Sequence, residues 1–71
     1  MNNDLISITA NGDAQDVPQD TTIQQFLEAS GYAGATVAVA VNLSFVPRSE
    51  YTRRTLAPGD EVEVGAPMQG G

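Results

Sequence analysis

Alternating apolar and polar residues predict a strand near the start of the chain and a hairpin after it. Residues 5–10 place Ile6 and Ile8 on one face and serine and threonine on the other, which is the two-residue period of a half-buried strand. The Asn-Gly pair at 11–12 supplies the positive φ angles of a tight turn. Residues 14–17 then return as a second strand that ends at a proline. We therefore expect the fold to open with a β-hairpin.

A helical pattern follows the hairpin. Its apolar face repeats at i, i+3, i+4 and i+7 and consists of Ile23, Phe26, Leu27 and Ser30. Thr21 and Gln24 have the spacing of a capping box, in which two side chains satisfy free backbone N–H groups at a helix start. The helix is therefore expected to begin near Thr22. Gly31 can adopt the left-handed conformation that ends helices, and the helix is expected to lay its apolar face on a sheet.

The longest apolar run lies in the middle of the chain and predicts an interior strand. Valines alternate with alanines within residues 36–42, so both faces are apolar, as in a central strand covered by a helix. After a turn at 42–44, a brief strand at 45–46 must stop at Pro47, because proline has no N–H group for a sheet ladder. A short helical turn is expected over residues 49–53.

The last predicted strand follows a strong turn signal, Pro-Gly-Asp at 58–60. Residues 61–65 alternate glutamate with valine, which puts the acids on one face and the valines on the other. The order of elements predicts an α+β fold of the β-grasp type, with a mixed sheet of four to five strands and one main helix.

Length and charge restrict the classes of function. A chain of 71 residues forms one small domain. Its net charge of −6 repels phosphate backbones and anionic lipids, so neither nucleic acid nor a membrane is an expected partner. The apolar run at 37–41 is far shorter than the roughly 20 residues that span a bilayer. The first residues carry no basic group and no secretory apolar core, so we expect a cytoplasmic protein.

Missing residue types exclude much catalytic chemistry. The chain has no cysteine and no histidine, which removes disulfides, thiol catalysis, zinc thiolates and the commonest general base. All three basic residues are arginines, so no lysine is present to carry biotin or lipoate. Asp13, Asp16 and Asp20 do not follow the spacing of a calcium loop. We therefore expect no metal site and no bound cofactor.

Three motifs, in order, carry a resemblance to a known family. They are Val41-Asn42 followed by Val46-Pro47-Arg48, then Leu56-Ala57-Pro58-Gly59-Asp60-Glu61-Val62, then the terminal Gly70-Gly71. The chain resembles the bacterial sulfur carriers among the ubiquitin-like proteins, the ThiS/MoaD family. Its short length and its segment Val46-Pro47-Arg48-Ser49-Glu50 are most similar to the thiamine branch, ThiS. Pro67, before the terminal Gly70-Gly71, resembles the proline-containing approach to the terminus in the molybdopterin branch.

The resemblance implies a sulfur carrier that is a protein co-substrate and not an enzyme. Residues 1–66 would form the β-grasp carrier domain and residues 67–71 a flexible Gly-Gly tail. A ThiF-like adenylyltransferase would use ATP and magnesium to adenylate the Gly71 carboxylate. Sulfur from a sulfurtransferase or cysteine desulfurase would convert it to a thiocarboxylate. The thiazole synthase ThiG would then use that sulfur to form the thiazole ring of thiamine.

Partner binding is expected at the tail and at exposed apolar side chains. Without a Cβ atom, Gly70 and Gly71 can thread a narrow channel in a partner enzyme. Leu43, Phe45 and Met68 are candidate docking residues, because an apolar side chain beside a turn or near the tail can anchor a partner. Simple packing in the core is the alternative for Phe45.

Three other functions are compatible with the same residues. The chain could be the small subunit of molybdopterin synthase, held by a catalytic large subunit. It could be a ubiquitin-like modifier, joined through Gly71 to a lysine of a target protein. It could also be a stand-alone β-grasp binding module whose last glycines have no chemical role.

Overall fold

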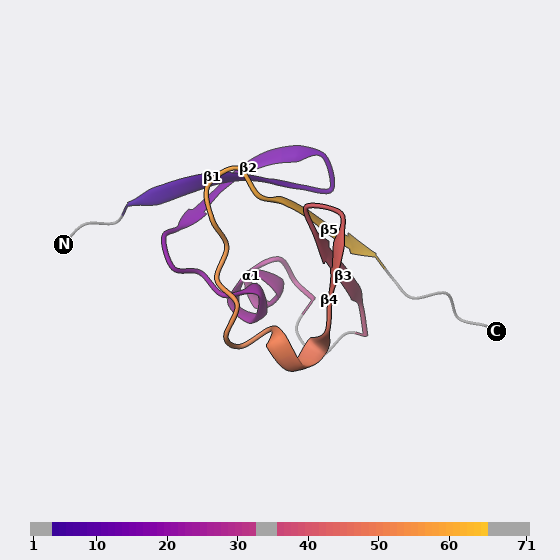
Figure 1. Ribbon diagram of the computed structural model, residues 1–71. Helices are drawn as coiled ribbons and strands as arrows, with labels where there is room; N and C mark the ends of the chain where they lie inside the picture. Colours follow the sequence, from indigo (N-terminus) through magenta and orange to yellow (C-terminus); the bar gives the residue numbers. More distant parts are fainter. Residues whose placement is uncertain (1–3, 33–35, 66–71) are drawn as a thin grey trace.

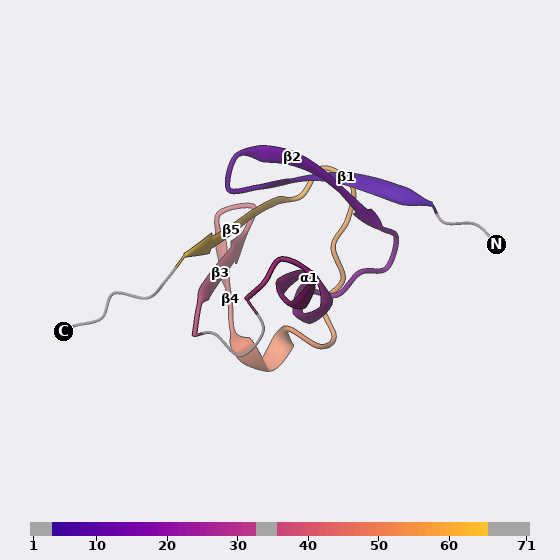
Figure 2. The ribbon, with the colours of Figure 1, turned by 180° about the vertical axis from the view of Figure 1, so that it is seen from behind.

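The computed structural model describes residues 4–32 and 36–65 of the chain. These residues form one sheet with an α-helix inside its curve, as Figures 1 and 2 show from opposite sides. In chain order the elements are β1 (Leu5–Ala10), β2 (Asp13–Pro18), α1 (Ile23–Ala29), β3 (Ala38–Val41), β4 (Ser44–Val46), the 3-10 helix η1 (Arg48–Glu50) and β5 (Glu61–Gly65).

The sheet is mixed, and its last strand in sequence lies at its centre. The spatial order is β2-β1-β5-β3-β4. β5 runs parallel to β1 and antiparallel to β3, while β1–β2 and β3–β4 are antiparallel hairpins. The prediction of a four- to five-stranded mixed sheet with one main helix in a β-grasp arrangement is confirmed.

Both hairpins turn through an asparagine with a positive φ angle. Asn11 and Gly12 have φ values of 51° and 89°, and Asn42 and Leu43 have values of 54° and 70°. These consecutive left-handed conformations are those of the two-residue turns that match the twist of the strands. The sequence predicts the first turn from its Asn-Gly pair, whereas Leu43 is an unusual residue for such a position.

The N-terminus of α1 is capped one residue later than predicted. The Thr22 hydroxyl accepts a hydrogen bond from the Gln25 N–H at 3.1 Å, and the Gln25 side chain accepts one from the Thr22 N–H at 3.0 Å. Thr21 instead donates its hydroxyl to the Pro18 carbonyl at 2.6 Å and is buried. Overlapping Thr-x-x-Gln spacings in the sequence explain the difference, because Thr21 with Gln24 and Thr22 with Gln25 satisfy the same rule.

The hydrophobic core fills the space between α1 and one face of the sheet. The helix contributes side chains that are almost fully buried, and valines and isoleucines from β1, β2, β3, β4 and β5 meet them. The helical members are Ile23, Phe26 and Leu27. Ser30, predicted as the fourth member of this face, is exposed at the C-cap. Gly31 follows with a φ of 89°, as its predicted role in ending the helix requires.

The two faces of β3 differ in burial more than the apolar sequence indicates. Val39 and Val41 are buried in the core, whereas Ala38 is exposed and Ala40 is only partly buried. The helix therefore covers one face of β3, and the alanine face lies on the side of the sheet away from it. β3 has a neighbouring strand on each side, as predicted, but β5 occupies the centre of the sheet.

Candidate functional site

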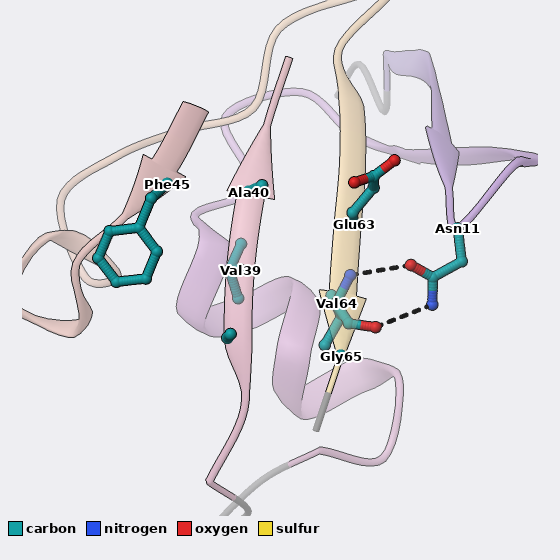
Figure 3. A pocket seen from close by; sticks show the side chains of 8 residues that line it. Asn11, Val39, Ala40, Phe45, Glu63, Val64 and Gly65 are labelled. Atoms are coloured by element: carbon teal, nitrogen blue, oxygen red, sulfur yellow. Dashed lines mark hydrogen bonds between the residues drawn. The ribbon is translucent and has the colours of Figure 1, made fainter. Parts of the chain in front are cut away.

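A shallow depression lies on the sheet across β3, β4 and β5. Its floor is shaped by the strand register, because Ala40 pairs with Glu63 on one side and with Phe45 on the other. The small alanine side chain leaves a hollow between the phenylalanine and the glutamate. Figure 3 shows the lining residues Asn11, Ala38, Val39, Ala40, Phe45, Glu63, Val64 and Gly65.

Phe45 forms the apolar wall of this depression. Its side chain is 70% exposed, so the alternative that it packs in the core is wrong. Pairing with Ala40 directs the ring to the helix-free face, since successive residues of a strand point to opposite sides. The adjacent Val46 is fully buried. An exposed aromatic ring beside a hollow has the character of an anchor for a partner protein.

Leu43 lies elsewhere on the surface. It is 83% exposed in the turn between β3 and β4, next to the end of β3 that pairs with Val62. Gly65 lies at the opposite end of β5. The structure therefore does not bring Leu43 into the depression with Phe45. A third exposed apolar residue, Leu5 on β1, is 58% exposed and was not predicted as a candidate.

The exposed side chains of β5 include two glutamates, one of which lines the depression. Glu61 and Glu63 point away from the core while Val62 and Val64 are buried, which confirms the predicted separation of the two faces of this strand. Glu63 lines the depression opposite Phe45 (Figure 3). The site thus combines an aromatic side chain, small apolar residues and one carboxylate, that of Glu63.

Asn11 connects the first hairpin to the end of β5. Its side-chain oxygen accepts a hydrogen bond from the Val64 N–H at 2.8 Å, and its side-chain nitrogen donates to the Val64 carbonyl at 3.2 Å (Figure 3). The amide group thereby pairs with Val64 as the backbone of a neighbouring strand would. The sequence indicated only the turn role of Asn11, since Val64 is distant along the chain.

Asn42 makes a related connection at the start of β5. Its side-chain oxygen accepts from the Glu61 N–H at 3.0 Å, and its nitrogen donates to the Asp60 carboxylate at 3.0 Å. The other carboxylate oxygen of Asp60 accepts from the Ala57 N–H at 2.9 Å. This network joins two of the motifs that carry the family resemblance, and it holds the turn that precedes β5.

The remaining predicted site residues lie outside the described part of the chain. These are Met68, Gly70 and Gly71, and the division between a domain at 1–66 and a tail at 67–71 falls there as well. Gly65, the last residue of β5, lines the depression. The predicted tail at 67–71 therefore begins two residues after Gly65, which lines the candidate docking site.

Two further observations concern metals and membranes. Among residues 4–32 and 36–65, no three acidic, histidine or cysteine side chains are grouped to hold a metal ion. Within the same residues, no helix has the length and apolar character needed to cross a bilayer.

Comparison with known proteins places these features in a family. The family model described as the ThiS family matches residues 1–71. The fold is similar to the crystal structure of the thiamine biosynthesis protein ThiS from Geobacter metallireducens, with a TM-score of 0.82 and 29% sequence identity. That match covers 93% of this chain and 100% of the other. A search of curated proteins found no match.

Proposed function

We propose, because the chain belongs to the ThiS family, that its Gly71 carboxylate carries sulfur for the thiazole ring of thiamine. The observation that carries this proposal is the family match over the whole chain, through Gly70 and Gly71. The protein from Geobacter metallireducens, named as a thiamine biosynthesis protein, supports the same pathway. The chain acts as a cytoplasmic co-substrate whose terminus is modified by partner enzymes.

The chemistry takes place at the Gly71 carboxylate. A carboxylate is a poor acyl donor, so a ThiF-like adenylyltransferase first joins it to AMP from ATP and releases pyrophosphate, with magnesium on the nucleotide. A persulfide from a sulfurtransferase or cysteine desulfurase attacks the acyl carbon and displaces AMP. A thiol then cleaves the sulfur–sulfur bond reductively, which leaves the thiocarboxylate. The thiazole synthase ThiG then takes that sulfur into the thiazole ring as the ring forms. The acyl carbon of Gly71 exchanges its C–S bond for a C–O bond, with net uptake of the oxygen of water, which regenerates the carboxylate.

The folded domain contributes docking and not chemistry. Ordering a tail residue in a partner's channel costs about 1 to 2 kcal/mol of backbone entropy. Contacts made by the domain surface must offset that cost. We place these contacts at Phe45 and the adjacent alanines, with Glu61 and Glu63 facing basic groups of the partner. Leu43 and Met68 remain additional candidates at other positions.

Intact-mass measurement tests the proposal directly. The protein is incubated with ATP, magnesium and a cysteine-fed extract of its source cells, beside a variant that lacks Gly71. We expect the full-length chain alone to gain the mass difference between sulfur and oxygen. If an extract that is active on a known carrier produces no shift, the chain is a binding module and the proposal is wrong.

The same experiment separates the other candidate functions. A ubiquitin-like modifier would form products joined to lysines of extract proteins, which appear as larger species in place of the thiocarboxylate. A molybdopterin synthase subunit would acquire the thiocarboxylate but copurify with a catalytic large subunit. Recovery of ThiG with the wild-type chain, and transfer of sulfur to thiazole, would support the thiamine pathway.

A further inference from the structure

Two asparagines hold β5 at its two ends through their side chains. Asn42 bonds to Glu61 at the start of the strand, and Asn11 bonds to Val64 near its end. Each asparagine also occupies a hairpin turn with a positive φ angle. The two residues therefore share a left-handed conformation, and the side chain of each accepts a hydrogen bond from a β5 N–H group. Only Asn11 does so near the C-terminal end of β5.

Asn11 extends the pairing between β1 and β5 beyond the point where the β1 backbone turns away. The Thr9 N–H donates to the Asp60 carbonyl at 3.0 Å, and the Asn11 N–H donates to the Val62 carbonyl at 2.9 Å. The chain then enters the turn at Gly12. The next position along β5 is Val64, whose N–H and carbonyl are both bonded to the Asn11 side chain.

On its other side, the end of β5 is paired with β3. Val39 lies opposite Val64 and Ala38 lies opposite Gly65. Loss of the Asn11 amide would leave the strand end supported by β3 alone. The last residues of β5 would then have more freedom, although the sheet and its core would persist.

We infer that Asn11 is a positioning residue, which holds the end of β5 and so fixes the direction in which the C-terminal tail leaves the domain. The inference rests on the proposed function, since direction matters only if Gly71 must enter a partner's active site. When the domain is docked, the position and direction of the end of β5 determine where the terminus reaches in the partner. Misplacement of a reacting group by about 1 Å can lower a rate by as much as about 100-fold.

Tail length and tail direction have effects of different size. Release of Val64 and Gly65 would lengthen a six-residue tether to eight residues, because residues 66–71 follow Gly65. Effective concentration falls roughly as the −3/2 power of length, which is less than about a twofold loss. A loss of about five- to tenfold would therefore measure the loss of direction.

The variants Asn11→Gly and Asn42→Gly form a matched pair for the test. Glycine keeps the positive φ angle of either turn and removes the side-chain amide. Both substitutions add similar freedom to the unfolded chain. Asn11→Asp is a second variant, since it retains an acceptor for the Val64 N–H but loses the donor to the Val64 carbonyl.

Adenylation is followed as ATP–pyrophosphate exchange with the adenylyltransferase that activates the wild-type chain. We expect Asn11→Gly to lower kcat about five- to tenfold. KM should stay within about twofold, because Asn11 borders the depression on the side opposite Phe45 and the apolar anchor is retained (Figure 3). Asn11→Asp should show an intermediate loss. Asn42→Gly should leave both constants within about twofold of the wild type. Hydrogen exchange at the Val64 amide should be at least about fivefold faster in Asn11→Gly alone.

The outcomes separate this inference from the proposed function. If the wild-type chain is not adenylated, the proposed function fails and the inference fails with it. If the wild type is adenylated but Asn11→Gly keeps the wild-type kcat, or loses as much as Asn42→Gly, the inference alone is overturned. If Asn11→Gly does not fold, a wild-type kcat in folded Asn11→Asp overturns it equally.

Discussion

Phe45 places an aromatic ring in solvent, where it contributes little to the stability of the fold. Burying such a side chain stabilises a protein by about 1.5 to 3 kcal/mol, yet 70% of this one is exposed. The neighbouring Val46 is fully buried on the opposite side of the strand. A binding role gives a physical reason for an exposed phenylalanine beside a hollow lined by Ala38 and Ala40.

Phe45→Ala should therefore affect docking more than stability. We expect the free energy of unfolding to change by less than about 1 kcal/mol, while KM for adenylation rises at least about fivefold. Urea unfolding followed by circular dichroism measures the first quantity, and ATP–pyrophosphate exchange measures the second. Leu5→Ala is the matched control, since Leu5 is 58% exposed but does not line the depression. Equal effects of the two substitutions on KM would contradict a docking role for Phe45.

Single residues also show which features the sequence predicts and which it does not. Alternation of glutamate and valine correctly predicts which side chains of β5 face the core. The second role of Asn11 has no local signal, because its partner Val64 is 53 positions away and reaches it only through the parallel pairing of β1 and β5. The exposure of Phe45 likewise depends on which face of β4 the helix covers. Met68, Gly70 and Gly71 remain predictions.

At the level of elements, residue spacing alone does not determine which of two threonines caps the start of α1. Thr21 and Thr22 each have a glutamine three residues later. The structure selects Thr22 as the cap because Thr21 is buried and bonded to the Pro18 carbonyl. The prediction of the helix and of its buried residues Ile23, Phe26 and Leu27 is confirmed, whereas the observed cap lies one residue after the predicted one.

Thr22→Ala tests this assignment of the cap. We expect it to lower the free energy of unfolding by about 1 kcal/mol, because the Gln25 N–H loses its acceptor. Gln24→Ala should change it by less than about 0.5 kcal/mol, since the Gln24 side chain donates to the exposed Glu28 carboxylate and its backbone N–H bond to the Tyr51 carbonyl is kept. Chemical denaturation of both variants provides the comparison. A larger loss for Gln24→Ala would restore the cap predicted from the sequence.

The alanine face of β3 gives a second prediction at this level. Ala40→Leu would fill the hollow between Phe45 and Glu63 without entering the core, because Ala40 points to the helix-free side. We expect the free energy of unfolding to stay within about 1 kcal/mol of the wild-type value. KM for adenylation should rise at least about fivefold. The control is Ala14→Leu on β2, an exposed alanine that does not line the depression. Unchanged adenylation in Ala40→Leu would exclude this face from docking.

At the scale of the whole molecule, the predictions of β-grasp architecture and of membership in the ThiS family are both confirmed. The element order followed from hydrophobic periodicity and turn residues, such as the Asn-Gly pair of the first hairpin. Periodicity alone did not place β5 between β1 and β3, because two-residue alternation identifies a strand but not its neighbours. The proposed sulfur chemistry rests on the terminal glycines and on membership in the family, and the folded core gives no information about it.

The net charge of −6 predicts how association with a partner depends on salt. If basic groups of the partner face Glu61 and Glu63, the association rate should fall about tenfold or more between low and high ionic strength. Stopped-flow measurements at several salt concentrations test this. Glu61→Gln with Glu63→Gln should flatten the dependence, whereas Asp13→Asn with Glu28→Gln, on β2 and α1, should leave its slope nearly unchanged. Equal slopes for the two double variants would contradict the assignment.

The central position of β5 also has a consequence for synthesis of the chain. Residues 5–18 and 38–46 can form their hairpins soon after they leave the ribosome, because each pairs with a near neighbour in sequence. These hairpins have no direct strand pairing with each other in the described sheet, and within the sheet they are connected only through β5. Thr9 can pair with Glu61 only after that residue, more than fifty positions later in the chain, has been synthesised. A nascent or truncated chain without β5 would expose two unpaired inner edges, so completion of the fold coincides with emergence of the segment that leads to the terminus proposed to carry sulfur.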